Sequence, residues 1–234
     1  MRLYAAAAAA LFAIAITGCS HAPGYPPAAP LPPSQIASFK VLYGTNCAAC
    51  HGPTGQGGPA MDLANPKFQG LISDAQMRDI IANGMHGTEM PPWAQSAGGM
   101  LTDKQVDVLV AGMRKRWYRP NAFNGATPPP FAADKPGDPK AGQQLYHDRC
   151  LSCHTGPARQ QVTSPVYLAL VSDQALRSII IAGRPDIGQP DWQHDNGQPL
   201  TPQNVDDIVA YLHSLRNPDA VSAAPTSILP GDTK

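Results

Sequence analysis

Apolar residues recur at helical spacing in two long segments of the chain. From residue 102 to about residue 116, and again from residue 201 to 215, they fall three and four positions apart, which is typical of one face of an amphipathic helix. The apolar positions are Val106, Leu109, Val110 and Met113 in the first segment, and Val205, Ile208, Val209, Leu212 and Leu215 in the second. Thr102 and Thr201 precede them and suit helix N-caps. No alternating strand pattern competes, so the sequence predicts an all-α protein.

Capping signals predict further short helices. Ser, Thr and Asp favour the N-cap position, proline favours the first helical position, and glycine favours the C-terminal end. The predicted ends are Ser34 and Asp138 (followed by Pro139) before the first helices, Ser73 or Asp74 and Ser172 or Asp173 before the middle helices, and Gly84 and Gly183 after the middle helices.

The chain contains an internal repeat. Residues 73–84 align with residues 172–183 at a constant offset of 99. The same register pairs Pro66 with Pro165, Pro91 with Pro190, Trp93 with Trp192, and Leu101-Thr102 with Leu200-Thr201. Two copies of one structural unit are therefore predicted.

Proline-rich segments divide the chain. They lie at residues 21–33 and 119–139, and such segments favour extended spacers over packed cores. We therefore predict a tether over residues 19–33, module 1 over 34–117, a linker over 118–137, module 2 over 138–217, and a C-terminal tail over 218–234. Each module is small, and small domains usually need a staple such as a bound cofactor.

The N-terminus has the form of an export signal. Arg2 is followed by an alanine-rich apolar run to Ile16, which is too short to span a bilayer comfortably. Thr17-Gly18 before Cys19 resembles a bacterial lipobox, which predicts that residues 1–18 are removed and that Cys19 is lipidated. The mature protein is then expected to be a membrane-anchored lipoprotein facing the periplasm. The formal net charge of zero gives no support for nucleic-acid binding.

The four remaining cysteines form two identical motifs. Cys47 and Cys50 precede His51, and Cys150 and Cys153 precede His154. Two disulfides or a zinc site are alternatives, but the histidine after each second cysteine favours covalent attachment of haem. Both thiols of a motif can add to the vinyl groups of one porphyrin, and the histidine then reaches the iron. The sequence thus predicts two haem c groups, with His51 and His154 as proximal iron ligands.

Module 1 resembles the class I cytochrome c family. The resemblance rests on Cys47–His51, Gly52, Pro59, Gly84, Met90-Pro91 and Trp93 in that order. It implies a few short helices around the haem, Met90 as distal ligand of haem 1, and the Pro59 carbonyl as partner of the His51 ring. The competing sulfurs belong to Met61, Met85 and Met100.

Module 2 departs from this pattern, because the repeat places Gln189 where module 1 has Met90. Every methionine lies at or before Met113, so module 2 has none of its own. The distal side of haem 2 is left open, or is occupied by Gln189 or His194. His147 is expected on the first helix of module 2, near the attachment site, and His213 on a solvated face of the last helix.

The family resemblance implies single-electron transfer from a quinol-oxidising or other donor complex to a terminal oxidase or reaction centre. Methionine opposite histidine raises the potential, so electrons are expected to enter at haem 2 and leave from haem 1. The alternatives are a dihaem oxidoreductase, resembling thiosulfate dehydrogenases or peroxidases with haem 2 as the catalytic iron, and a haem-based sensor. No other catalytic motif stands out.

Overall fold

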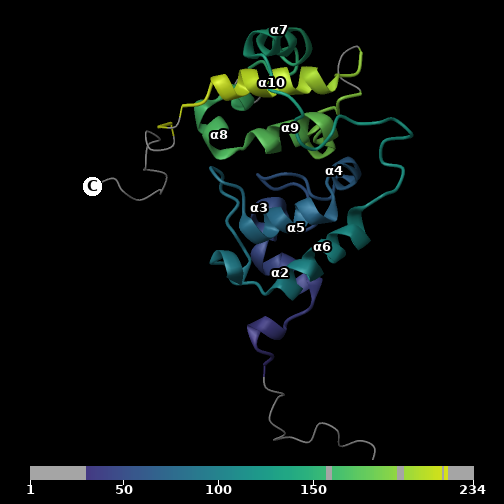
Figure 1. Ribbon diagram of the computed structural model, residues 1–234, viewed down its shortest axis with the longest axis vertical. Coiled ribbons are helices and arrows are strands. Elements are labelled where there is room, and N and C mark those ends of the chain that lie inside the picture. The colour runs from purple at the N-terminus through teal and green to yellow at the C-terminus, as the bar shows by residue number, and fades with distance from the viewer. Residues whose placement is uncertain (1–29, 157–159, 194–197, 218, 221–234) are drawn as a thin grey trace, which may run out of the picture. The chain divides into compact units, whose positions relative to one another are not determined.

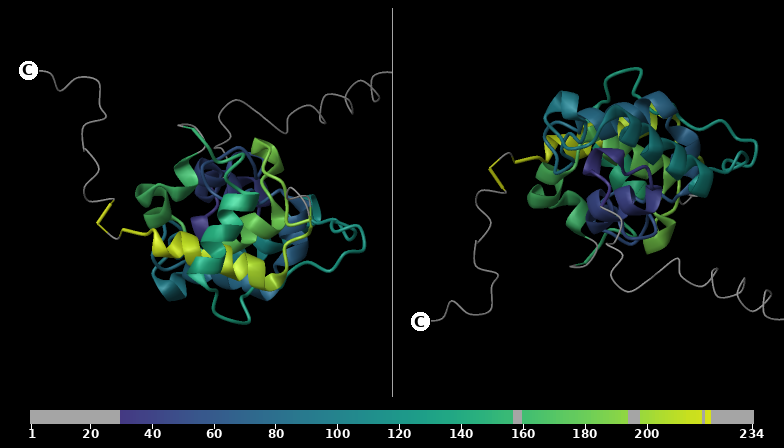
Figure 2. Two further views of the ribbon diagram at one scale, coloured as in Figure 1. Left: turned by 90° about the horizontal axis from the view of Figure 1, so that it is seen from above. Right: turned by 90° about the horizontal axis from the view of Figure 1, so that it is seen from below.

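The computed structural model describes residues 30–156, 160–193, 198–217 and 219–220, and within these ranges it contains helices and loops but no extended strand (Figure 1). The views in Figure 2 show the same helical construction from both ends. The elements are η1 (Pro33–Gln35), α2 (Phe39–Asn46), α3 (Ala48–His51), α4 (Pro66–Leu71), α5 (Asp74–Asn83), η2 (Gln95–Ala97), α6 (Asp103–Trp117), α7 (Pro139–Arg149), η3 (Gln160–Thr163), α8 (Pro165–Leu170), α9 (Asp173–Ala182), η4 (Pro185–Ile187) and α10 (Pro202–Ser214). Within the described residues, every helix is too short or too polar to traverse a bilayer.

Most of the predicted caps are confirmed. Ser73 Oγ accepts a hydrogen bond from the backbone N–H of Gln76 at 3.2 Å, and the Gln76 side chain accepts one from Ser73 N–H at 3.0 Å. Thr102 and Thr201 are the N-caps of α6 and α10 and form the same reciprocal pair of hydrogen bonds. These bonds satisfy backbone donors that have no partner within the helix. Ser172 likewise caps α9.

The first helices show one confirmed cap and one error. Asp138 accepts a hydrogen bond from Lys140 N–H at 2.8 Å, with Pro139 in the first turn of α7. The prediction of Ser34 is wrong, because α2 begins at Phe39 after Ser38 and Ser34 lies in η1. The apolar face formed by Leu42 and Tyr43, both buried, determines where α2 packs.

Each module has its own apolar core. In module 1 the helix α6 supplies Val106 and Leu109, which are completely buried, and it packs on α2 and α5. In module 2 the helix α10 supplies Val205 and Ile208, and it packs mainly on α7. Equivalent residues of the repeat therefore fill equivalent core positions, as the helical spacing predicts.

The segment between α6 and α7 packs on both modules instead of acting only as a spacer. Phe131 packs against the core of module 1, and Ala126 packs against the core of module 2. The backbone carbonyls of Pro130 and Phe131 accept hydrogen bonds from Arg177. Proline limits helix formation here, but it does not prevent these contacts.

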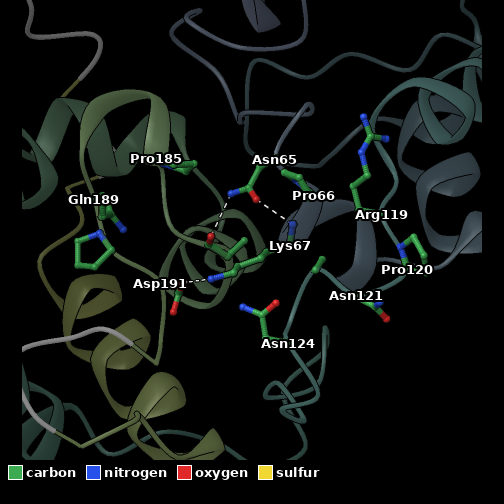
Figure 3. A pocket seen from close by; sticks show the side chains of 13 residues that line it. Asn65, Pro66, Lys67, Arg119, Pro120, Asn121, Asn124, Pro185, Gln189 and Asp191 are labelled. Atoms are coloured by element: carbon green, nitrogen blue, oxygen red, sulfur yellow. Dashed lines mark hydrogen bonds and ion pairs between the residues drawn. The ribbon is translucent and has the colours of Figure 1, made fainter.

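The two modules also contact each other directly. Asn65, which is buried, caps α4 and donates a hydrogen bond to the carbonyl of Ala182 at 3.0 Å (Figure 3). It also donates to the carbonyl of Gly183 at 3.1 Å. Lys67 forms an ion pair with Asp191 beside it. A cavity of about 700 Å³ opens at this contact, and its lining includes Gln189.

Candidate haem sites

A turn of helix organises the first cysteine motif. The N–H groups of Cys50 and His51 both donate to the carbonyl of Cys47, at 3.2 and 3.0 Å. Residues three and four apart in a helix lie on one face, so this turn gathers the two sulfurs and the imidazole. Cys47 is buried, Cys50 is exposed, and neither forms a disulfide. The arrangement suits attachment of a planar group along one edge.

The imidazole of His51 is oriented by the backbone. Its Nδ1 lies 2.9 Å from the carbonyl oxygen of Met61, a contact that makes Nδ1 the protonated nitrogen and leaves Nε2 as the free ligand atom. Burial lowers the pKa of His51, which favours the neutral form that binds metals. The prediction that the Pro59 carbonyl holds this ring is wrong, because Met61 supplies the oxygen.

The loop after the motif explains this shift. The backbone at Gly52 and Gly55 has positive φ angles of 79° and 90°, which glycine adopts without steric cost. The loop then folds back so that Ala60 N–H donates to the Cys50 carbonyl at 3.0 Å. This fold of the loop brings the carbonyl of Met61, the residue after Ala60, to the His51 ring.

The Met90 loop lies at the end of α5. Gly84 ends α5 with φ 71°, and a Cβ there would lie 2.7 Å from the Met90 carbonyl oxygen, so glycine permits the close approach. Met85 N–H donates to that same oxygen at 3.0 Å, and Met90 N–H donates to Thr88 Oγ1 at 3.1 Å. The side chain of Met90 is half-buried. Met90 stays the predicted distal ligand, on a loop whose backbone is well held.

The competing sulfurs differ in their surroundings. Met100 is 71% exposed, which does not suit a ligand enclosed with haem. Met61 packs against the core of module 1. Met85 lies across the hairpin from Met90, so it is the competitor that an experiment must separate from Met90.

The second motif repeats the geometry of the first. Cys153 and His154 N–H groups donate to the carbonyl of Cys150 at 3.1 and 3.0 Å. The ring of Tyr146 stacks near that of His154, with centroids 6.4 Å apart. The turn that follows α7 again places two sulfurs and an imidazole on one side.

The distal loop of module 2 shares one backbone hydrogen bond with its counterpart but differs from it in conformation and in side chains. Arg184 and Gln189 exchange backbone hydrogen bonds of 3.0 and 2.9 Å, at the repeat positions of Met85 and Met90. The side chain of Gln189 donates to the Ile179 carbonyl at 3.4 Å. His194, the other candidate ligand, lies outside the described residues. His147 and His213 are exposed and lie beside Asp148 and Asp173.

One buried polar atom bears on whether haem fits module 2. Trp192 is 8% exposed, and its indole Nε1 has no hydrogen-bond partner among the residues that the structure describes. A buried N–H without an acceptor is costly. A propionate of a haem held by Cys150, Cys153 and His154 would supply the acceptor, so the donor set and this atom both fit the group.

Family models match both modules. The model described as "Cytochrome C oxidase, cbb3-type, subunit III" matches residues 34–111, and the model described as "Cytochrome c" matches residues 139–216. The chain is a tandem dihaem cytochrome of class I. Its two cytochrome c domains each carry one covalently bound haem c. When bound, haem supplies one-electron redox chemistry at its iron.

Curated relatives match along both modules. The cytochrome is 26% identical over 197 residues to the "Cbb3-type cytochrome c oxidase subunit FixPc" of Rhizobium leguminosarum bv. viciae, covering 77% of this chain and 61% of the relative. It is 26% identical over 202 residues to subunit FixP of Sinorhizobium medicae, covering 77% and 62%. The cytochrome thus spans about three fifths of the length of these relatives.

Among solved structures, a chain of the Kuenenia stuttgartiensis reducing HAO-like protein complex aligns with a TM-score of 0.43 and 18% identity, over 76% of this chain and 96% of that one.

The residues that join the modules were not predicted from the sequence, chiefly Asn65, which donates to the Ala182 carbonyl, and Arg184, whose guanidinium donates to the Ala60 carbonyl. Single polar residues in loops carry no periodic signal that reveals a distant partner. For Arg184 the repeat contains a signal, because this charged residue occupies the position of the apolar Met85 of module 1, and such a change indicates a different environment.

Proposed function

We propose that this cytochrome carries single electrons from a quinol-oxidising or other donor complex to a terminal oxidase of the cbb3 type. The matched family model and the names of the curated relatives support an oxidase as the acceptor.

The direct contact between the haem-bearing modules carries this proposal. The distal loop of module 2 donates hydrogen bonds from Arg184 to the carbonyls of Ala60 and Gly58, in the loop that orients His51. Two redox modules fixed against each other suit transfer of an electron from one haem to the other. Methionine ligation of haem 1 by Met90 would make it the higher-potential centre, so electrons would enter at haem 2 and leave from haem 1.

The test uses the purified full-length protein with both haems reduced. We expect membranes containing a cbb3-type oxidase to oxidise both haems, one electron each, while membranes without the oxidase do not. We also propose that His194 or Gln189 closes the distal side of haem 2, so neither ferrous haem should take up carbon monoxide. A high-spin haem 2 that binds carbon monoxide and turns over peroxide or thiosulfate would favour the oxidoreductase, and binding without turnover would favour a sensor.

We further propose that lipid on Cys19, which lies outside the described residues, anchors the cytochrome to a membrane on its periplasmic side. Cys19→Ser should abolish incorporation of labelled palmitate into the cytochrome, because the Cys19 thiol carries the acyl chains that supply the membrane affinity. Ser20→Ala is the matched control and should be labelled like the wild type. Labelling of the Cys19→Ser protein to the wild-type level would contradict the lipid anchor.

A further inference from the structure

Arg184 of module 2 is buried against module 1. The residue is 8% exposed, and its guanidinium donates to the carbonyls of Ala60 at 3.1 Å and Gly58 at 3.5 Å. The same group holds both carboxylate oxygens of Asp186, each at 2.8 Å. Since Arg184 begins the loop that ends at Gln189, the distal loop of one module contributes a charge to the other.

The Arg184 charge lies against the loop of module 1 that holds His51, the proximal ligand of haem 1. Ala60 precedes Met61, whose carbonyl holds the His51 ring, and Ala60 N–H donates to the carbonyl of Cys50. Asp186 reaches the same loop, because Gly57 N–H donates to its Oδ2 at 3.4 Å. The Arg184–Asp186 pair therefore lies against the backbone that positions the proximal ligand.

Three ionisable side chains share this region: Arg184, Asp186 and Asp62. Asp62 is 2% exposed, and Arg184 holds the pKa of Asp186 below its ordinary value, which keeps that carboxylate ionised. Charges in a buried region are screened much less than surface charges. Ferric haem carries one more positive charge than ferrous haem, so a nearby cation favours the ferrous form and a nearby anion favours the ferric form.

We propose that module 2 sets the redox potential of haem 1 through the Arg184–Asp186 pair, with the guanidinium raising the potential and the carboxylate lowering it. This inference rests on a haem bound through His51 and is independent of the donor and acceptor proposed above. It assigns module 2 a second role, because removing or altering its loop changes a haem that module 2 does not ligate.

A double-mutant cycle of Arg184→Gln and Asp186→Asn in the full-length dihaem protein tests the inference. Arg184→Gln keeps an amide donor for the Ala60 carbonyl and leaves the carboxylate of Asp186 without its cation, so it should lower the potential of haem 1. A tenfold change in the oxidised-to-reduced ratio corresponds to about 59 mV for one electron, and we expect a change of about this size. Asp186→Asn should raise the potential, and the double variant should return it toward the wild-type value. Spectroelectrochemical titration at the methionine-to-iron band follows haem 1.

The control is Arg216→Gln. Arg216 also bonds an aspartate and a backbone carbonyl, those of Asp173 and Val171, but both partners belong to module 2. It should leave the potential of haem 1 unchanged. If Arg184→Gln and Asp186→Asn shift the potential in the same direction, loosened packing is the cause and the inference is overturned. It is equally overturned if Arg184→Gln shifts haem 1 no more than Arg216→Gln.

Discussion

Replacing Met90 by alanine is expected to lower the potential of haem 1 and to let its ferrous iron bind carbon monoxide. The thioether opposite His51 favours ferrous iron and closes the sixth coordination position. The backbone bonds of the loop, from Met85 N–H to the Met90 carbonyl and from Met90 N–H to Thr88, do not involve the thioether, so the loop should keep its shape. Carbon monoxide uptake should rise from none to one molecule per haem 1, measured by optical titration of the reduced protein.

Two further methionines control this experiment. Met100→Ala removes a thioether that is 71% exposed and should change neither the potential nor carbon monoxide uptake. Met85→Ala probes the competitor across the hairpin and should leave iron ligation intact. Loss of methionine ligation in the Met85→Ala protein, with the Met90→Ala protein unchanged, would show that the distal ligand is Met85.

The helices were predictable because their signals are local. Ser73 and Thr102 have their capping partners three residues away, and Gly84 permits a positive φ at the position where α5 ends. The spacing of Val106 and Leu109 already indicates which face of α6 is buried. Such patterns depend on backbone geometry that every helix shares, so a single sequence suffices to find them.

The predictions from the sequence were wrong or incomplete where residues far apart in the chain determine the structure. The acceptor for His51 depends on how a loop rich in glycine folds back, and Met61 rather than Pro59 arrives there. The contacts of Asn65 with Ala182 and Gly183 join residues more than a hundred positions apart. Composition predicts that the segment with Pro130 is extended, but it contains no information about the surface along which that segment lies.

Arg177→Met is expected to destabilise the cytochrome by about 3–5 kcal/mol, the usual cost of removing one partner of a buried ion pair. Arg177 is 2% exposed and pairs with Asp206, which is 7% exposed. Burial raises the pKa of Asp206 and Arg177 opposes that rise, so the carboxylate would be left uncompensated. The carbonyls of Pro130 and Phe131 would lose their donor as well. Denaturant unfolding of the dihaem protein, followed by circular dichroism, measures the loss.

The repeat supplies the matched control. Arg78 and Asp107 occupy the positions of Arg177 and Asp206 in module 1 and form the same ion pair, but their side chains are 40% and 61% exposed. Water and salt screen that pair, so Arg78→Met should leave the free energy of unfolding nearly unchanged. The segment around Pro130 creates the difference, since it covers the pair in module 2 only. Equal destabilisation by the two substitutions would mean that burial by this segment is not what makes Arg177 important.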